Sequence, residues 1–164
     1  MEIPTYNIEI ASPLGPVCIT SSSKGLLSVQ LNQKAPEKSS TNEHCDLAAK
    51  ELSEYFEGTR KGFNVAFDLD NNTQFYQEVW KYLNSIPFGE TRSYLDIANH
   101  LGDPNSVRAV GMANGKNPIA IIIPCHRVIG SNGKLVGYAG GLDAKRWLLE
   151  HELTYRTKPN HLLF

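Results

Sequence analysis

The segment Ile121–Val128 reads Ile-Ile-Ile-Pro-Cys-His-Arg-Val and contains the residue types best suited to covalent chemistry. Three β-branched residues predict a buried extended segment, and Pro124 ends it because proline lacks the N–H that a strand requires. Cys125 therefore follows a rigid core element directly. His126 and Arg127 come next, and positive charge with hydrogen bonding lowers a thiol pKa from its usual ~8.5. The pattern predicts a thiolate nucleophile at Cys125, and a buried structural cysteine is the alternative.

Two short helices with a tight turn between them are predicted upstream of this segment. Ser93 and Asp96 have the spacing of a capping box for the first helix, and a Gly-Asp-Pro turn leads into a second helix over residues 105–113. The pair forms either a helix-turn-helix or an ordinary helical hairpin. Small residues around Arg108 would let the second helix approach a partner closely, and Arg108 itself could reach phosphates or enter a base stack.

The remaining pattern predicts a small sheet followed by helices, which is an α+β chain. Alternating apolar residues and turn signals predict strands near residues 3–10, 16–20 and 26–31, in an antiparallel meander. Apolar residues at helical spacing predict helices at about 47–57, after Thr73 and over 142–153. The polar segment 68–73 is the candidate domain boundary.

Composition restricts the location and the cofactors. The chain has 164 residues and 41% apolar residues, with no apolar run near the ~20 residues that cross a bilayer. The first ten residues lack the pattern of a signal peptide, so we expect a cytoplasmic protein that does not contact membranes. Cys18, Cys45 and Cys125 are too widely spaced for a disulfide framework or a zinc ribbon. We therefore expect reduced thiols, no cofactor and no metal.

Charge is distributed unevenly along the chain. Residues 1–80 carry six basic and eleven acidic residues, a balance of −5, whereas residues 81–164 carry ten and six, a balance of +4. A basic second half is compatible with a nucleic-acid surface there, although a balance this small does not require one.

Several motifs in order resemble the O6-alkylguanine-DNA alkyltransferase family, the methylated-DNA:protein-cysteine methyltransferases. The resemblance covers about residues 75–153, with weaker support from Ser12-Pro-Leu-Gly15 and Gly25-Leu26. The motifs that carry it are Ser93-Tyr94, Ile97-Ala98, Arg108-Ala-Val-Gly111, Asn117-Pro118, Ile123-Pro-Cys-His-Arg-Val128, Gly137-Tyr138, Gly140-Gly-Leu142, Lys145, Trp147-Leu-Leu149 and Glu152.

The resemblance implies two domains and a tail. Residues 1–70 would form a ribonuclease H-like antiparallel sheet domain, residues 71–156 a mostly helical domain with the helix-turn-helix and the active site, and residues 157–164 a tail. It further implies a monomer that binds double-stranded DNA containing O6-alkylguanine through the minor groove and flips the damaged base. The expected activity is irreversible, single-turnover transfer of the alkyl group to Cys125, with O4-alkylthymine as a further candidate substrate.

The resemblance also implies a role for each matching residue. Cys125 would accept the alkyl group, His126 would act as base through a water, and Glu152 would orient that imidazole. Asn117 would hold the active-site turn, and Tyr94 would donate a hydrogen bond or proton to the leaving guanine. The DNA-binding residues would be Ser93, Arg108, Ala109 and Gly111, with Arg108 filling the gap left by the flipped base. The base pocket would be formed by Val128, Tyr138, Ala139 and Gly140.

Three other functions remain open on the sequence. A non-catalytic damage-binding protein of the same fold would bind alkylated DNA without covalent change. A cysteine hydrolase would need a separate histidine, since neighbouring residues such as Cys125 and His126 rarely form a direct dyad. A helix-turn-helix transcription factor would need a dimerisation segment, which the pattern does not show.

Overall fold

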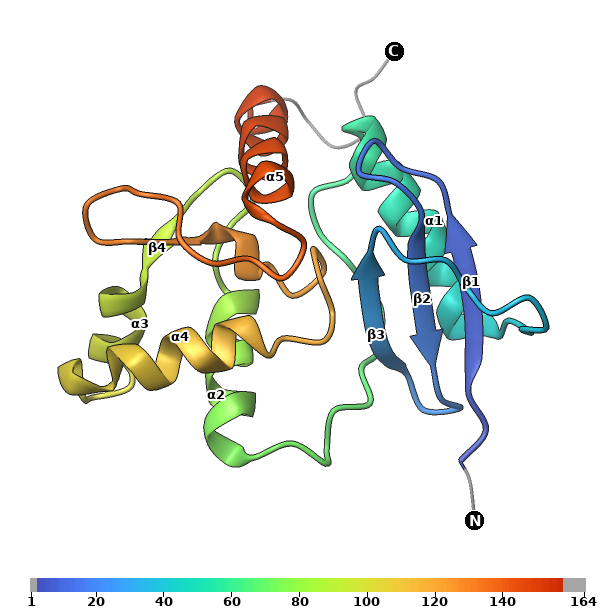
Figure 1. The fold of residues 1–164 in the computed structure, drawn as a ribbon, viewed down its shortest axis with the longest axis horizontal. Helices are drawn as coiled ribbons and strands as arrows, with labels where there is room; N and C mark the ends of the chain where they lie inside the picture. The colour runs from blue at the N-terminus through green and yellow to red at the C-terminus, as the bar shows by residue number, and fades with distance from the viewer. Residues whose placement is uncertain (1–2, 158–164) are drawn as a thin grey trace. The chain divides into compact units, whose positions relative to one another are not determined.

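The structure is a computed structural model that describes residues 3–157, and its backbone divides into two compact units (Figure 1). Among the described residues, unit 1 contains 3–70, 118–122 and Thr157, and unit 2 contains 71–117 and 123–156. The predicted α+β class is confirmed, with the antiparallel sheet in unit 1 and most helices in unit 2. The predicted tail, residues 157–164, lies outside the described residues except for Thr157.

Unit 1 is built on a three-stranded antiparallel sheet with the order β1-β2-β3. The strands are β1 (Tyr6–Ile10), β2 (Val17–Ser21) and β3 (Leu26–Leu31), so the predicted meander is confirmed. Helix α1 (Glu43–Glu57) packs on β1 and β2 (Figure 1). Apolar side chains of the central strand β2 are buried, because the sheet is covered where α1 lies against it.

The segment before Cys125 is buried, but it is not the extended segment that its β-branched residues predict. Residues 118–122 meet the edge of β3, where Val29 N donates to Pro118 O at 2.9 Å and Ala120 N donates to Val29 O at 3.2 Å. The chain then turns at Ile121, whose φ is +70°, and Ile122 N bonds back to Ala120 O at 2.8 Å. The burial of residues 121–123 was predicted correctly from the residue types. The turn at Ile121 was not predicted, because it depends on contacts with β3, which is distant in sequence.

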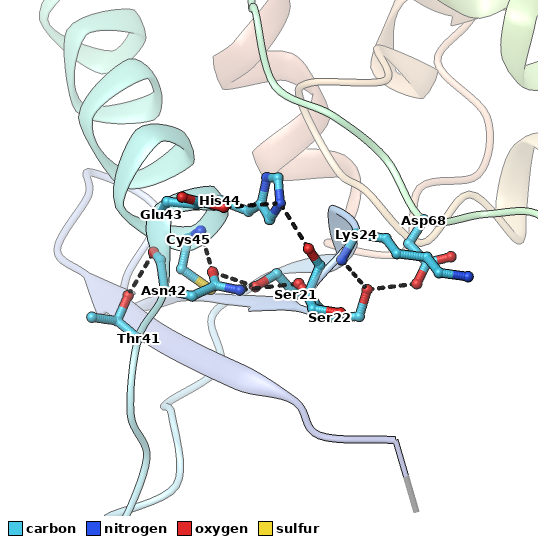
Figure 2. Close-up of polar contacts among 10 residues, drawn as sticks. Ser21, Ser22, Lys24, Thr41, Asn42, Glu43, His44, Cys45 and Asp68 are labelled. Carbon is cyan, nitrogen blue, oxygen red and sulfur yellow. Dashed lines mark hydrogen bonds and ion pairs between the residues drawn. The ribbon is translucent and has the colours of Figure 1, made fainter.

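A polar network surrounds the beginning of α1 (Figure 2). Asn42 caps the helix, because its Oδ1 accepts from Cys45 N at 3.0 Å, and Ser21 Oγ donates to the same oxygen at 2.7 Å. The Cys45 thiol lies 3.1 Å from Ser21 Oγ. Ser22 Oγ donates to Asp68 Oδ2 at 2.5 Å and so ties the β2–β3 turn to the end of unit 1. Cys18 and Cys45 are both buried side chains of this unit.

Unit 2 consists of short helices with two small strands between them. The helices are α2 (Gln74–Asn84), α3 (Tyr94–His100), α4 (Val107–Gly115) and α5 (Leu142–Tyr155), with 3₁₀ turns η1 (Pro104–Ser106) and η2 (Cys125–Arg127). Strand β4 (Arg92–Ser93) pairs in parallel with β5 (Val128–Ile129). None of the helices within residues 3–157 is both long and apolar enough to cross a membrane.

Local signals in the sequence locate the starts of α2 and α3 correctly. Thr73 caps α2 by accepting from Tyr76 N, and Ser93 with Asp96 forms the predicted capping box of α3. The second helix of the pair begins later than predicted, at Val107, because η1 precedes it. The helices α3 and α4 pack against each other through the turn, as a helix-turn-helix requires.

Trp80 connects α2 to the end of α4. Its ring is 3% exposed, and its Nε1 donates to Ala113 O at 2.8 Å. Lys116 N also donates to this carbonyl, at 3.2 Å, so the indole N–H is its second and closer donor. The contact helps to hold the end of α4 against α2.

We predict that Trp80→Phe lowers the free energy of unfolding by about 1–3 kcal/mol, because it removes the shorter of the two hydrogen bonds to the Ala113 carbonyl and also removes buried ring volume. Denaturant titration measures the change. A matched control is Tyr82→Phe, which removes a hydroxyl from a half-buried ring of the same helix. That change should stay below about 0.5 kcal/mol. Equal losses in the two variants would contradict the role given to the indole N–H.

Candidate active site

Cys125 is the first residue of η2 and its side chain is 7% exposed. The backbone on both sides of the thiol is held by side-chain amides. Asn117 Nδ2 donates to Ile123 O at 2.7 Å, and Asn114 Nδ2 lies 3.4 Å from Cys125 O. Cys125 N also donates to Ile123 O, at 2.8 Å. The thiol is therefore carried on a turn whose carbonyl groups are fixed by two asparagines.

The electrostatics of Cys125 differ from the sequence expectation. Burial raises the pKa of the thiol, while a hydrogen bond with the Asn117 side chain and the charge of Lys145 lower it without reversing the shift. The cation that acts on the thiol is Lys145 of α5, whereas Arg127, the neighbour in sequence, is bound elsewhere. In this state Cys125 is a protonated thiol that must lose a proton before it can act as a nucleophile.

Glu152 of α5 is the centre of a buried cluster. Its carboxylate accepts from His126 Nε2 at 2.6 Å and from Arg127 Nε at 2.7 Å and Nη2 at 3.1 Å. It also accepts from Gly89 N at 3.2 Å. Arg127 Nη1 donates to Ile86 O at 2.6 Å. Glu152 and His126 are each fully buried, so the cluster depends on these internal partners rather than on water.

The protonation states of the cluster follow from these contacts. Burial alone would raise the pKa of Glu152, but His126 and Arg127 outweigh it and hold that pKa well below its usual range. Burial lowers the pKa of His126, although Glu152 opposes this effect. The histidine is thus neutral, with its proton on Nε2 facing an ionised carboxylate. Its Nδ1 is buried and has no hydrogen-bond partner among the residues that the structure describes.

Lys145 and Tyr94 converge on the loop between β5 and α5. Lys145 Nζ donates to Val136 O at 2.9 Å and to Gly137 O at 3.2 Å, and the Tyr94 hydroxyl donates to Val136 O at 3.0 Å. Burial lowers the pKa of Lys145 to about 8, against the opposing charge of Cys125. Burial also raises the pKa of Tyr94, with Cys125 as the second cause. Both side chains therefore lie in the electrostatic environment of the thiol.

The four expected base-pocket residues have different environments. Val128 is fully buried in β5, whereas Ala139 and Gly140 are exposed in the loop that leads to α5. Tyr138 has a buried hydroxyl without a hydrogen-bond partner among residues 3–157. Burial raises its pKa well above the usual value, with contributions from Cys125 and Glu152. The charges of the thiolate and of the carboxylate would thus both oppose ionisation of the Tyr138 hydroxyl.

The expected DNA-binding residues do not all lie on one surface. Arg108 and Ala109 are exposed on α4, beside Met112, which is 62% exposed. Gly111 turns toward α3, since a Cβ added there would lie 4.0 Å from Tyr94 Cδ1. Ser93 is half-buried and its side chain caps α3. Arg108 and Ala109 therefore remain available to a partner, while Gly111 and Ser93 shape the packing beneath.

Sequence reasoning missed the contribution of Asn114. This side chain is buried, contacts the backbone of Cys125 and lowers the pKa of Tyr94 against the larger effect of burial. In the sequence it belongs to an Asn-Gly-Lys-Asn-Pro segment that is typical of a loop, so no local signal distinguished it from a turn residue. Its role depends on α4 continuing through Gly115, which brings the amide inward.

The arrangement combines a fixed thiol, a neutral imidazole with a free acceptor nitrogen, and a buried ammonium group. These are the components of nucleophilic catalysis in which a base takes the thiol proton and a third group orients the base. Within residues 3–157, no three His, Cys, Asp or Glu side chains are grouped so that they could hold a metal ion.

Two family models match this chain. Residues 5–69 match the 6-O-methylguanine DNA methyltransferase ribonuclease-like domain, and residues 74–154 match the DNA binding domain of the same family. A methylated-DNA–protein-cysteine methyltransferase of Mycobacterium tuberculosis is 48% identical over 148 residues, which cover 87% of this chain and 89% of the relative. One of Methanosarcina acetivorans is 46% identical over 153 residues, covering 90% and 97%.

Solved structures agree with these matches. The crystal structure of Mycobacterium tuberculosis O6-methylguanine methyltransferase is 43% identical with a TM-score of 0.82, covering 93% of this chain and 94% of that one. A crystal structure of Mycobacterium tuberculosis OGT in complex with DNA is 45% identical with a TM-score of 0.82, covering 92% and 94%. By sequence and by structure, the chain belongs to the 6-O-methylguanine DNA methyltransferase family.

Proposed function

We propose that this protein repairs alkylated DNA by transferring the alkyl group from O6-alkylguanine to Cys125, in a single and irreversible event. The observation that carries the proposal is the cluster of Cys125, His126 and Glu152, in which a neutral imidazole with a free Nδ1 follows the thiol directly. The family and its relatives, named for transfer from methylated DNA to a protein cysteine, support the same reaction.

The reaction balances without a cofactor. The thiol proton passes through a water to His126 Nδ1, and the thiolate attacks the alkyl carbon in line with the C–O6 bond. A sulfur–carbon bond forms, the carbon–oxygen bond breaks, and its electron pair stays on guanine. The purine takes up one proton from water as charge develops on it, His126 returns the thiol proton to water, and Tyr94 donates a hydrogen bond to the purine at this step. The products are unmodified guanine and an S-alkylcysteine, and because a thioether is a poor leaving group the protein is not regenerated.

The reacting base must leave the duplex, because the alkyl carbon inside the stack is out of reach of a buried thiol. We propose that α3 and α4 bind the minor groove of double-stranded DNA, that Arg108 occupies the place of the flipped nucleotide, and that the chain acts as a monomer. The exposure of Arg108, Ala109 and Met112 on one side of α4 supports this assignment. We further assign DNA binding and chemistry to residues 71–156 as one domain and residues 1–70 to the other.

The proposed function predicts one added alkyl group per protein molecule. After incubation with a duplex that contains one O6-methylguanine, intact-mass and peptide spectra should show a single methyl group on the peptide with Cys125. Cys125→Ala should accept none yet still bind the duplex. Binding by the natural protein without a mass change would instead identify a damage-binding protein, and repeated turnover of an ester would identify a hydrolase.

The proposed role of Arg108 predicts that its removal slows alkyl transfer from double-stranded DNA more than from single-stranded DNA. Arg108→Ala should slow transfer from duplex DNA by about tenfold or more, since the gap in the stack stays unfilled, and should change transfer from a single-stranded oligonucleotide much less. Single-turnover rates measure both. Arg146→Ala, at an exposed arginine of α5, removes the same charge as a control. Equal losses on both substrates would remove Arg108 from base flipping.

The proposed role of Lys145 predicts a pH-dependent loss. Its ammonium group lowers the pKa of Cys125, so Lys145→Met should raise that pKa further and slow transfer by roughly tenfold at neutral pH. The ratio of natural to variant rate should fall as pH rises through about 8, where Lys145 itself loses its charge. Arg146→Met is the control. A ratio independent of pH would mean that Lys145 only anchors the loop.

A further inference from the structure

Arg127 has no assigned part in the alkyl transfer, although it lies beside the base. The residue is 5% exposed, and each of its three guanidinium nitrogens donates a hydrogen bond. Nε and Nη2 hold the two oxygens of Glu152, Nη1 donates to Ile86 O, and the guanidinium lies 5.7 Å from the centre of the Phe88 ring. A cation held this firmly inside a protein needs its counter-charge, and Glu152 provides it.

The charges of the cluster balance only if His126 is neutral. Glu152 contributes one negative charge and Arg127 one positive charge, while His126 donates a single N–H to the carboxylate. A protonated His126 would add a second positive charge to a fully buried pair that is already neutral, and burial opposes any uncompensated charge. Without Arg127, the ion pair at 2.7 Å is lost while the imidazole stays 2.6 Å from the carboxylate, so the pair would become stable as imidazolium and carboxylate.

We propose, on the basis of the function proposed above, that Arg127 is a positioning residue for the transfer: it neutralises Glu152 so that His126 stays uncharged and keeps Nδ1 free to take the thiol proton. The Arg127 guanidinium acts on the chemistry only through Glu152 and His126. A histidine that is already protonated has no acceptor nitrogen. The charge balance of the cluster therefore decides whether His126 can accept the thiol proton.

The charged groups that act on the pKa of His126 are Glu152, Arg127 and Lys145. Lys145 of α5 lowers the pKa of His126, as does Arg127, whereas Glu152 raises it. The Tyr138 hydroxyl interacts with Glu152 and Cys125 and stays protonated because burial raises its pKa. Removal of Arg127 therefore removes one of two cations that keep the imidazole neutral and also releases Glu152 to hold a proton on it.

The test is the pH dependence of the transfer rate in charge-changing variants. In Arg127→Met the acid limb of the rate profile should move to higher pH by at least about 1 unit, because His126 must lose a proton before it can act. Arg127→Lys keeps the charge and should keep the midpoint, with a lower rate because the two-pronged contact is lost. The double variant Arg127→Met with Glu152→Gln removes both charges and should return the midpoint toward that of the natural protein.

A spectroscopic measurement separates this role from a purely structural one. Nitrogen NMR of His126 should show a neutral ring with its proton on Nε2 in the natural protein near neutral pH, and a protonated ring in Arg127→Met. Arg146→Met, an exposed arginine on α5, is the matched control and should change neither the spectrum nor the profile. A protonated His126 in the natural protein would overturn the proposal.

If Arg127→Met alone is too unstable to study, the role of Arg127 can be tested in a Glu152→Gln background. Adding Arg127→Met to the Glu152→Gln background removes the guanidinium without leaving a buried carboxylate unpaired, and the midpoint should rise relative to Glu152→Gln alone. If the midpoint of the acid limb is unchanged and the transfer rate is lower at every pH, Arg127 has only a structural role. If the natural protein accepts no alkyl group at all, the proposed function fails instead, and the ring protonation measured by NMR still decides the charge balance.

Discussion

The buried carboxylate of Glu152 is the interaction on which the structure of unit 2 most depends. It joins α5, which carries it, to η2 through His126 and Arg127, and to the turn before β4 through Gly89. An ionised carboxylate without water is stable only when donors surround it, so these segments cannot separate without a large electrostatic cost. The same contacts that hold the segments together also orient His126, so the stability of this unit and the geometry of the candidate site share residues.

Burial of the thiol creates a conflict that the surrounding residues partly resolve. A protected Cys125 is less prone to react with small electrophiles and oxidants, but burial also raises its pKa and removes the thiolate. Asn117 and Lys145 act against that effect without reversing it. The protein is thus held in a less reactive state, and in the proposed mechanism the thiol proton is lost when the alkylated base occupies the site and the neutral imidazole accepts that proton.

The loop between β5 and α5 is tied to the active site through backbone carbonyls rather than side chains. Val136 O accepts from both Lys145 and Tyr94, so the two residues that respond to the charge of Cys125 also fix the loop that would contact the base. Backbone contacts of this kind do not depend on which side chain the loop carries. The anchoring of the loop at Val136 and Gly137 is therefore set by donors from α3 and α5.

Much of this protein could be predicted from its sequence. Periodicity and caps predicted the antiparallel strands, the helix starts at Thr73 and Ser93, and the burial of Ile121–Ile123, because these depend on neighbours along the chain. The motif set predicted the family. Only the tertiary structure decided that Ile121 turns, that Asn114 supports the thiol, and that Arg127 binds Glu152 while Lys145 acts on Cys125. Those features depend on burial and on partners distant in sequence, and hydrogen bonds between such partners leave no pattern in the residues beside them.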